Sequence, residues 1–212
     1  MRQLTYQVAV SLDGYIAAAG GSFDAFAQTG DHIDALLDEW PETMPGHVLA
    51  ALGVEATTNT FDTGIMGWNT FAVGLPHGID SPYPHLRQYV LSRTRRLEDV
   101  GVGVELVSDD PIALVRSLKG EPGAGIWLCG GGVVAAAGRD GIDRLGLKIK
   151  PGMPGDGLPL FQPGPSPTPS FQLESRPRFV SGGLVAAYPA SRGLPWSPPA
   201  PSPARPVSPP PN

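Results

Sequence analysis

The chain has 212 residues, of which 41% are hydrophobic and 17% charged, so it is long enough for one domain with an ordinary core. A net charge of −5 gives no basic surface for nucleic acid or an acidic membrane. No apolar run approaches the ~20 residues of a membrane span, and the segment MRQLTYQVAVS lacks the basic stretch and cleavage motif of a signal peptide. We therefore expect a soluble, cytoplasmic protein.

Strand and helix signals alternate along the first 189 residues. Apolar runs predict strands at 4–11, 63–67, 88–92, 104–108, 125–130 and 144–151, and a terminal hairpin from 171–179 and 183–189. Helices are predicted at 31–40, 110–120 and 131–141, the first with Ile33, Leu36, Leu37 and Trp40 on one face. This alternation is typical of an α/β protein with a mostly parallel sheet, helices on both faces and an antiparallel edge at the C-terminal end.

We expect neither the cysteine nor the histidines to form a functional site. The single cysteine, Cys129, is expected to be a buried structural thiol. The four histidines are scattered without metal-ligand spacing, so we expect no metal site. Residues 190–212 are dominated by Pro, Ser and Ala and are predicted to be a disordered tail, which leaves one domain at 1–189.

Four of the predicted strands are followed by turns with ligand-binding chemistry, and ligands of open α/β sheets bind at the carboxyl ends of strands. The turns read SLDG from Ser11, MGWNT from Met66, LSRT from Leu91 and CGGG from Cys129. Glycines allow the backbone to approach a phosphate, and hydroxyl and guanidinium groups can hold one. Taken singly, each turn is equally compatible with an ordinary turn or a solvated charged loop.

Taken in order, these turns and the segment DRLGLKIKPGMPGDGLPLF at 143–161 resemble the dihydrofolate-reductase-like superfamily. The resemblance covers residues 3–188 and is closest to the reductase domain of riboflavin biosynthesis, the RibD C-terminal domain. It implies a three-layer α/β/α fold and a homodimer. It also implies an NADPH-dependent reductase that transfers a hydride to a pyrimidine- or pteridine-like heterocycle, as 5-amino-6-(5-phosphoribosylamino)uracil reductase does.

The same resemblance assigns residues to the cofactor. The positions that line the nicotinamide pocket in such proteins are Ala9, Ile16 and Ala17. Those that meet the diphosphate are Gly67, Thr70, Gly130, Gly131 and Gly132, and those at the strand end that holds the 2′-phosphate are Leu91, Ser92 and Arg93.

Two departures from the family pattern concern the cofactor and the proton donor. The family motif usually has a basic residue after Met-Gly, where this chain has Trp68; Arg93 or Arg95 can replace it, so we expect NADPH rather than NADH. The candidate catalytic acids are Asp13, in a cofactor-side turn, and Asp31, at the start of the 31–40 helix. Either carboxylate is also explained by an ordinary turn or a solvated helix face, and spacing does not decide.

Two other functions stay open. A fold relative that binds a nucleotide without turnover is favoured by Trp68 and by the lack of an assignable acid. A dihydrofolate or pteridine reductase is the third interpretation. No zinc-deaminase signature accompanies the reductase motifs, which favours a stand-alone reductase over a bifunctional riboflavin enzyme.

Overall fold

The computed structural model describes residues 1–23, 26, 30–131, 141–163, 170–174, 179 and 182–191. The predicted helix at 131–141 and the predicted tail beyond Ser191 lie outside the described residues, apart from the ends of that helix. Gly132 is also outside them.

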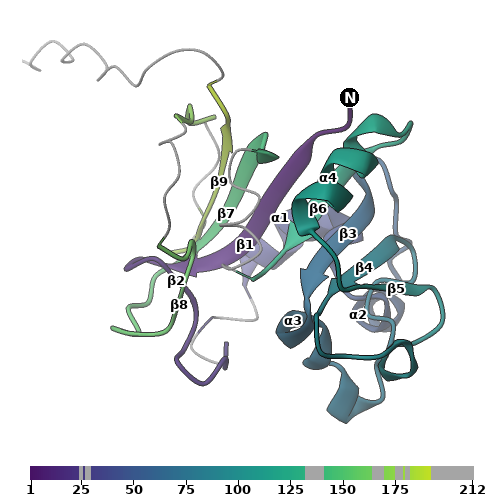
Figure 1. Cartoon of the computed structure of the whole chain (residues 1–212). Helices are drawn as coiled ribbons and strands as arrows, with labels where there is room; N and C mark the ends of the chain where they lie inside the picture. Colours follow the sequence, from purple (N-terminus) through teal and green to yellow (C-terminus); the bar gives the residue numbers. More distant parts are fainter. Residues whose placement is uncertain are drawn as a thin grey trace, which may run out of the picture.

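A seven-stranded sheet forms the centre of the protein, in the order β5-β4-β3-β6-β1-β7-β9. All neighbouring pairs are parallel except β7 and β9, which are antiparallel. The predicted mostly parallel sheet with an antiparallel C-terminal edge is therefore confirmed (Figure 1). The strands are β1 (Leu4–Ser11), β3 (Phe61–Gly67), β4 (Arg87–Leu91), β5 (Val104–Val107), β6 (Gly125–Cys129), β7 (Arg144–Lys150) and β9 (Leu184–Pro189).

Two short strands form a second, antiparallel pair beyond the end of β1. They are β2 (Tyr15–Ala17) and β8 (Leu158–Pro159). Leu12 N donates to Gly152 O and Leu160 N donates to Gly14 O, so the loops after β1 and β7 are joined along this pair.

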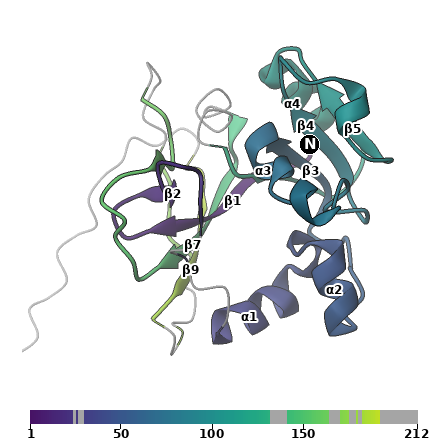
Figure 2. The ribbon, with the colours of Figure 1, turned by 90° about the horizontal axis from the view of Figure 1, so that it is seen from below.

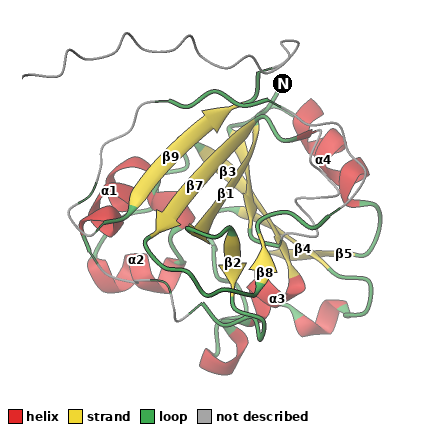
Figure 3. Ribbon diagram, turned by 90° about the vertical axis from the view of Figure 1, so that its left-hand side faces the viewer, coloured by secondary structure: helices red, strands yellow, loops and turns green. Residues whose placement is uncertain are grey.

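Helices cover both faces of the sheet, so the three-layer α/β/α arrangement is confirmed. Figure 2 shows α1 and α2 on one side and α4 on the other, and Figure 3 separates helices from strands by colour. The α-helices are α1 (Asp31–Glu39), α2 (Gly46–Leu52), α3 (Trp68–Ala72) and α4 (Pro111–Gly120); short 3-10 helices lie at Pro41–Thr43, Leu75–His77 and Leu97–Asp99. Within the described part of the chain, no helix combines the length and apolar character needed to cross a membrane.

Local signals explain the start of α4, the longest helix. Asp110 caps α4 because its side chain accepts a hydrogen bond from Ile112 N at 2.9 Å, and Pro111 suits the first helical position. Helix α1 buries His32 and Leu36, whereas Ile33 is half-buried. The buried stripe of α1 therefore runs through His32, which the sequence analysis left out of the apolar face.

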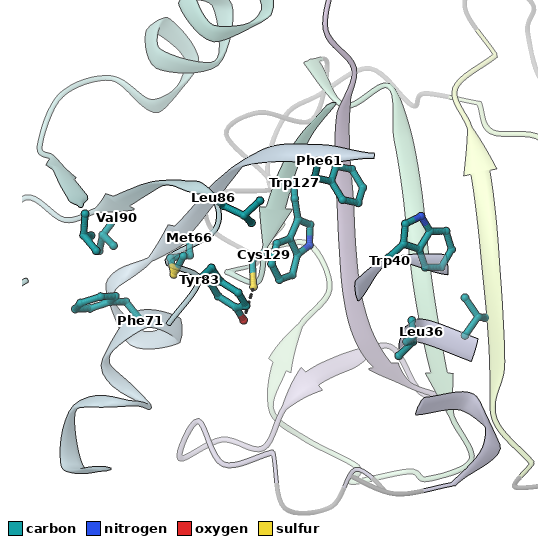
Figure 4. Close-up of a cluster of buried hydrophobic side chains, with 12 residues drawn as sticks. Leu36, Trp40, Phe61, Met66, Phe71, Tyr83, Leu86, Val90, Trp127 and Cys129 are labelled. Carbon is teal, nitrogen blue, oxygen red and sulfur yellow. Dashed lines mark hydrogen bonds between the residues drawn. The ribbon is translucent and has the colours of Figure 1, made fainter. Parts of the chain in front are cut away.

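The core on the α1 side of the sheet is rich in aromatic residues (Figure 4). Tyr83 and Trp127 meet edge to face with ring centroids 5.0 Å apart, and Trp127 is 2% exposed. Cys129 is buried here, as expected, and its Sγ lies 3.8 Å from the Tyr83 hydroxyl. Burial raises the pKa of the Cys129 thiol to about 11, so it stays protonated at neutral pH.

The predicted terminal hairpin is confirmed in part. Antiparallel bridges join Phe171 to Ala190 and Glu174 to Ala187, which places the segment from 171 to 174 beside β9. The remainder of its first predicted strand includes residues outside the described ones.

Candidate functional site

The carboxyl ends of the parallel strands bring the predicted cofactor turns to one edge of the sheet. In the β3–β4 ladder Gly67 is level with Leu91, and in the β3–β6 ladder Met66 is level with Cys129. The MGWNT, LSRT and CGGG turns therefore start side by side. The fourth turn follows β1, which lies on the other side of β6.

The glycine turn after β6 packs tightly against α3. Gly130 has φ 73° and Gly131 φ 85°, both in the left-handed region that favours glycine. A Cβ added to Gly130 would lie only 2.8 Å from Thr70 Oγ1, closer than real side chains approach. The loop thus needs glycine at Gly130 for two reasons, backbone conformation and close approach to Thr70. Such a loop leaves backbone amides free of covering side chains, which is what a bound diphosphate requires.

An arginine from the β4 turn lies over the aromatic residue of the β3 turn. The Arg95 guanidinium carbon is 4.5 Å from the centroid of the Trp68 ring, within cation–π range. Ser92 is half-buried and Arg93 exposed at the same strand end. Arg95 was expected as a possible replacement for the missing basic residue, whereas nothing in the sequence signals its contact with Trp68.

Hydrogen bonds to Asp13 link the loop after β1 to the loop after β7. Its Oδ1 lies 2.5 Å from Ser11 Oγ, and its Oδ2 accepts a hydrogen bond from Gly155 N at 2.8 Å. These bonds, that from Ser11 first, lower the pKa of the Asp13 carboxyl. The side chain is thus ionised at neutral pH and engaged in the turn. Ile16 and Ala17 follow it on β2, half-buried and buried respectively.

The start of α1 and the end of β7 meet near this edge. Asp31 is half-buried, whereas Asp34 is exposed, so Asp31 is the better sheltered carboxylate. Beside it His32 is 3% exposed, and its Nε2 is hydrogen-bonded to Lys150 Nζ. Burial, and then the neighbouring Lys148, lowers the pKa of Lys150 to about 8.

This histidine–lysine pair is the part of the site that sequence reasoning missed. Lys150 is level with Ser11 in the β1–β7 ladder, so the pair lies next to the SLDG turn. A stripe of His32, Leu36 and Trp40 at helical spacing was the available signal. No group of three or more histidine, cysteine or acidic side chains suited to a metal is found among the residues that the structure describes.

The family model of the RibD C-terminal domain matches residues 2–184. The chain belongs to this family. The match spans all four turns. A search of curated protein sequences finds no match.

Solved structures share the fold. A candidate riboflavin biosynthesis protein from Shewanella sp. PV-4 aligns with TM-score 0.64 and 24% identity, over 91% of this chain and all of that one. A pyrimidine reductase-like protein from Corynebacterium diphtheriae aligns with TM-score 0.59 and 18% identity, over 90% of this chain and 92% of its own.

A bifunctional protein also shares the fold. The diaminohydroxyphosphoribosylaminopyrimidine deaminase/5-amino-6-(5-phosphoribosylamino)uracil reductase of Thermotoga maritima aligns with TM-score 0.58 and 16% identity. The alignment covers 89% of this chain but 56% of the Thermotoga protein. These likenesses establish the fold, and membership of the RibD C-terminal domain family supports a pyrimidine reductase-like function.

Proposed function

We propose that this protein is an NADPH-dependent reductase that transfers a hydride to a pyrimidine- or pteridine-like heterocycle, similar to 5-amino-6-(5-phosphoribosylamino)uracil reductase. The observation that carries the proposal is the glycine loop against Thr70, at the edge where the four turns of a RibD C-terminal domain meet. The positive φ angles of Gly130 and Gly131 and the lack of room for a Cβ at Gly130 fit a loop that lies against a cofactor.

The residues at this edge fit a dinucleotide phosphate. Backbone amides of Gly130 and Gly131 and the Thr70 hydroxyl would hold the diphosphate, with Gly67 permitting its approach. NADPH, when bound, supplies the hydride. At the nicotinamide end Ala9, Ile16 and Ala17 offer small or apolar surface, which suits a neutral ring more than a charged one.

The 2′-phosphate would be held by Ser92 and by arginines of the following turn. Arg93 is exposed and directed by no described contact, whereas Arg95 stacks on Trp68. Arginine on an aromatic face keeps its N–H groups available at its edge, so Arg95 can supply the charge-assisted bond that Trp68 cannot.

We propose different roles for the two aspartates in the proton transfer that accompanies hydride transfer. Asp13 keeps its carboxylate ionised and orients the SLDG turn through Ser11 and Gly155. Asp31, half-buried at the start of α1 and next to His32, is the proposed donor, because the Asp13 carboxylate is already engaged by Ser11 and Gly155. The substrate is a small heterocycle, and we propose that the active form is a homodimer.

The alternative is a relative that binds the nucleotide without reducing anything, and Trp68 in place of a basic residue is the observation that favours it. Titration of the full chain with NADPH and NADH, followed by tryptophan fluorescence, tests both. Binding of NADPH with tighter affinity than NADH supports a cofactor site; no change with either at millimolar concentration overturns both proposals. Oxidation of NADPH, measured as loss of absorbance with a panel of pyrimidines and pterins, separates enzyme from binding protein.

A further inference from the structure

The strand order arranges the proposed cofactor site along one edge of the sheet. Neighbouring strands follow the order β4-β3-β6-β1-β7, so the arginine turn after β4 and the glycine turn after β6 lie on the same side of β1. With the 2′-phosphate at the β4 turn and the diphosphate against Gly130 and Gly131, the nicotinamide end of the cofactor extends towards β1 and β7. Side chains of β7 that lie beside Ala9 are therefore expected next to the nicotinamide.

Lys148 occupies this place on β7. It is level with Ala9 of β1 in one ladder and with Val185 of β9 in the other. Residues that are level in neighbouring strands lie on the same face of the sheet, so Lys148 stands between two apolar neighbours. Ala9 is also the residue that the proposed function places at the nicotinamide ring.

The side chain of Lys148 extends over β1 towards β6. Its ammonium group interacts electrostatically with the Cys129 thiol, and Cys129 belongs to β6, on the other side of β1. The small side chain of Ala9 leaves this path open. Because Cys129 directly precedes Gly130, the positive charge of Lys148 lies between Ala9 and the start of the glycine loop.

Lys148 has no counter-ion among the residues that the structure describes. It takes part in none of their ion pairs, and its Nζ forms no hydrogen bond with any of them. The Cys129 thiol is protonated at neutral pH and cannot balance the charge. Lys150, two residues further along the same face of β7, adds a second cationic group, hydrogen-bonded to His32. The electrostatic potential over Ala9 is therefore positive.

A positive potential at this place distinguishes the two redox states of a nicotinamide. The ring is neutral when reduced and carries a positive charge when oxidised. Like charges repel, and partly buried charges are screened less than exposed ones. The ammonium of Lys148 therefore opposes binding of the oxidised ring and has little effect on the reduced ring.

We propose that Lys148 sets the preference of the cofactor site for the reduced over the oxidised nicotinamide, by placing an unpaired ammonium group beside the ring. This role rests on the proposed function, since it requires NADPH at this edge of the sheet. Tighter binding of the reduced form also makes the bound cofactor a weaker reductant. The benefit is therefore in the exchange of oxidised for reduced cofactor, not in the hydride transfer itself.

The test compares the affinities of the full chain for NADPH and NADP⁺, measured by fluorescence titration. The ratio of the NADP⁺ Kd to the NADPH Kd should be above one in the wild type. Lys148→Met should lower that ratio by about tenfold, chiefly through tighter binding of NADP⁺. Lys148→Arg keeps the charge and should keep the ratio. Arg116→Met, which removes an exposed positive charge from α4 on the opposite face of the sheet, should also leave the ratio unchanged.

A second measurement uses the wild type alone. Burial lowers the pKa of Lys148, and Cys129 opposes that effect. The ratio of the two Kd values should therefore fall as pH rises from neutrality to about 10, where the lysine loses its charge. Cys129 and Tyr83 on one side, and Lys150 and His32 on the other, are the titratable groups around it. Lys148→Met should keep only the part of the pH dependence that Lys150 contributes.

The outcomes separate this inference from the proposed function. A wild-type ratio at or below one, a ratio that is constant with pH, or equal ratios in the wild type and Lys148→Met each overturn the role of Lys148. Equal changes in Lys148→Arg and Lys148→Met overturn it as well, because the charge is then not the cause. In all these cases NADPH still binds, and the proposed reductase stands. No binding of NADPH by the wild type removes the proposed function and the role of Lys148 together.

Discussion

The guanidinium of Arg95 lies 4.5 Å above the ring of Trp68, joining the turn after β4 to the turn after β3. Arg95 thus brings a cation next to Trp68, the residue that stands in place of the usual basic residue of the family motif. If the proposed cofactor site is right, Arg95→Ala should weaken NADPH by about tenfold to a hundredfold, the worth of a charge-assisted hydrogen bond. NADH, which has no 2′-phosphate, should lose little. Fluorescence titration of both cofactors measures the ratio.

Variants of two neighbouring arginines show whether the loss of NADPH affinity is specific to Arg95. Arg96→Ala changes the same net charge in the same turn and should alter both cofactors equally and weakly. Arg93→Ala should reduce the preference for NADPH if both arginines share the phosphate. If the preference for NADPH over NADH survives Arg95→Ala but disappears with Arg93→Ala, Arg93 alone binds the 2′-phosphate.

Gly130→Ala should damage the cofactor loop and the fold together. Alanine at φ 73° costs about 1 kcal/mol or more, and its Cβ would press on Thr70 Oγ1. We expect a loss of about 1–3 kcal/mol of unfolding free energy in urea, with weakened NADPH binding. Gly103→Ala is the matched control, since Gly103 has φ 83° but open space around it. Equal losses in the two variants would mean that the contact with Thr70 contributes nothing.

The sheet and the edge that carries the turns could be predicted from sequence because both follow from short-range patterns. Apolar runs such as GIWLC mark buried parallel strands, and parallel strands place their carboxyl ends at one edge. The turn residues then need no further information to come together, and Gly67, Leu91 and Gly130 do so.

The contacts between side chains from distant elements could not be predicted in this way. Trp68 and Arg95 meet only because two turns take particular paths, and His32 meets Lys150 only because α1 packs on the end of β7. The burial of Gln7 could not be predicted for a different reason. One polar residue in an apolar strand is compatible with either a solvent-facing position or a buried one, and the tertiary fold decides.

Asp13 should stabilise the turn in a pH-dependent way. Its pKa is lowered, by the Ser11 hydrogen bond first, so its contribution is complete above the unfolded pKa of about 3.9 and is lost as pH falls through the folded value. Asp13→Asn should lower the melting temperature at pH 7, and the difference from wild type should shrink below about pH 4. Asp109→Asn, an exposed change of the same charge, serves as control. A difference that stays constant into the acidic range would contradict the role of the carboxylate.

Lys150 should give a second rise of stability with pH, in the alkaline range. Burial and Lys148 lower its pKa to about 8, below the ~10.4 of an unfolded lysine. Between these values the unfolded chain binds more protons than the folded one, so the free energy of unfolding should rise with pH across this window. Lys150→Met should make that rise shallower, because methionine keeps the length of the side chain without its titration, while the part due to Lys148, whose pKa burial also lowers, stays. Urea unfolding of both proteins from pH 7.5 to about 10.5 measures the two slopes. Parallel profiles would show that Lys150 is not the group responsible, whereas a flatter profile for the variant would place a neutralised lysine beside His32 at the edge of the proposed active site.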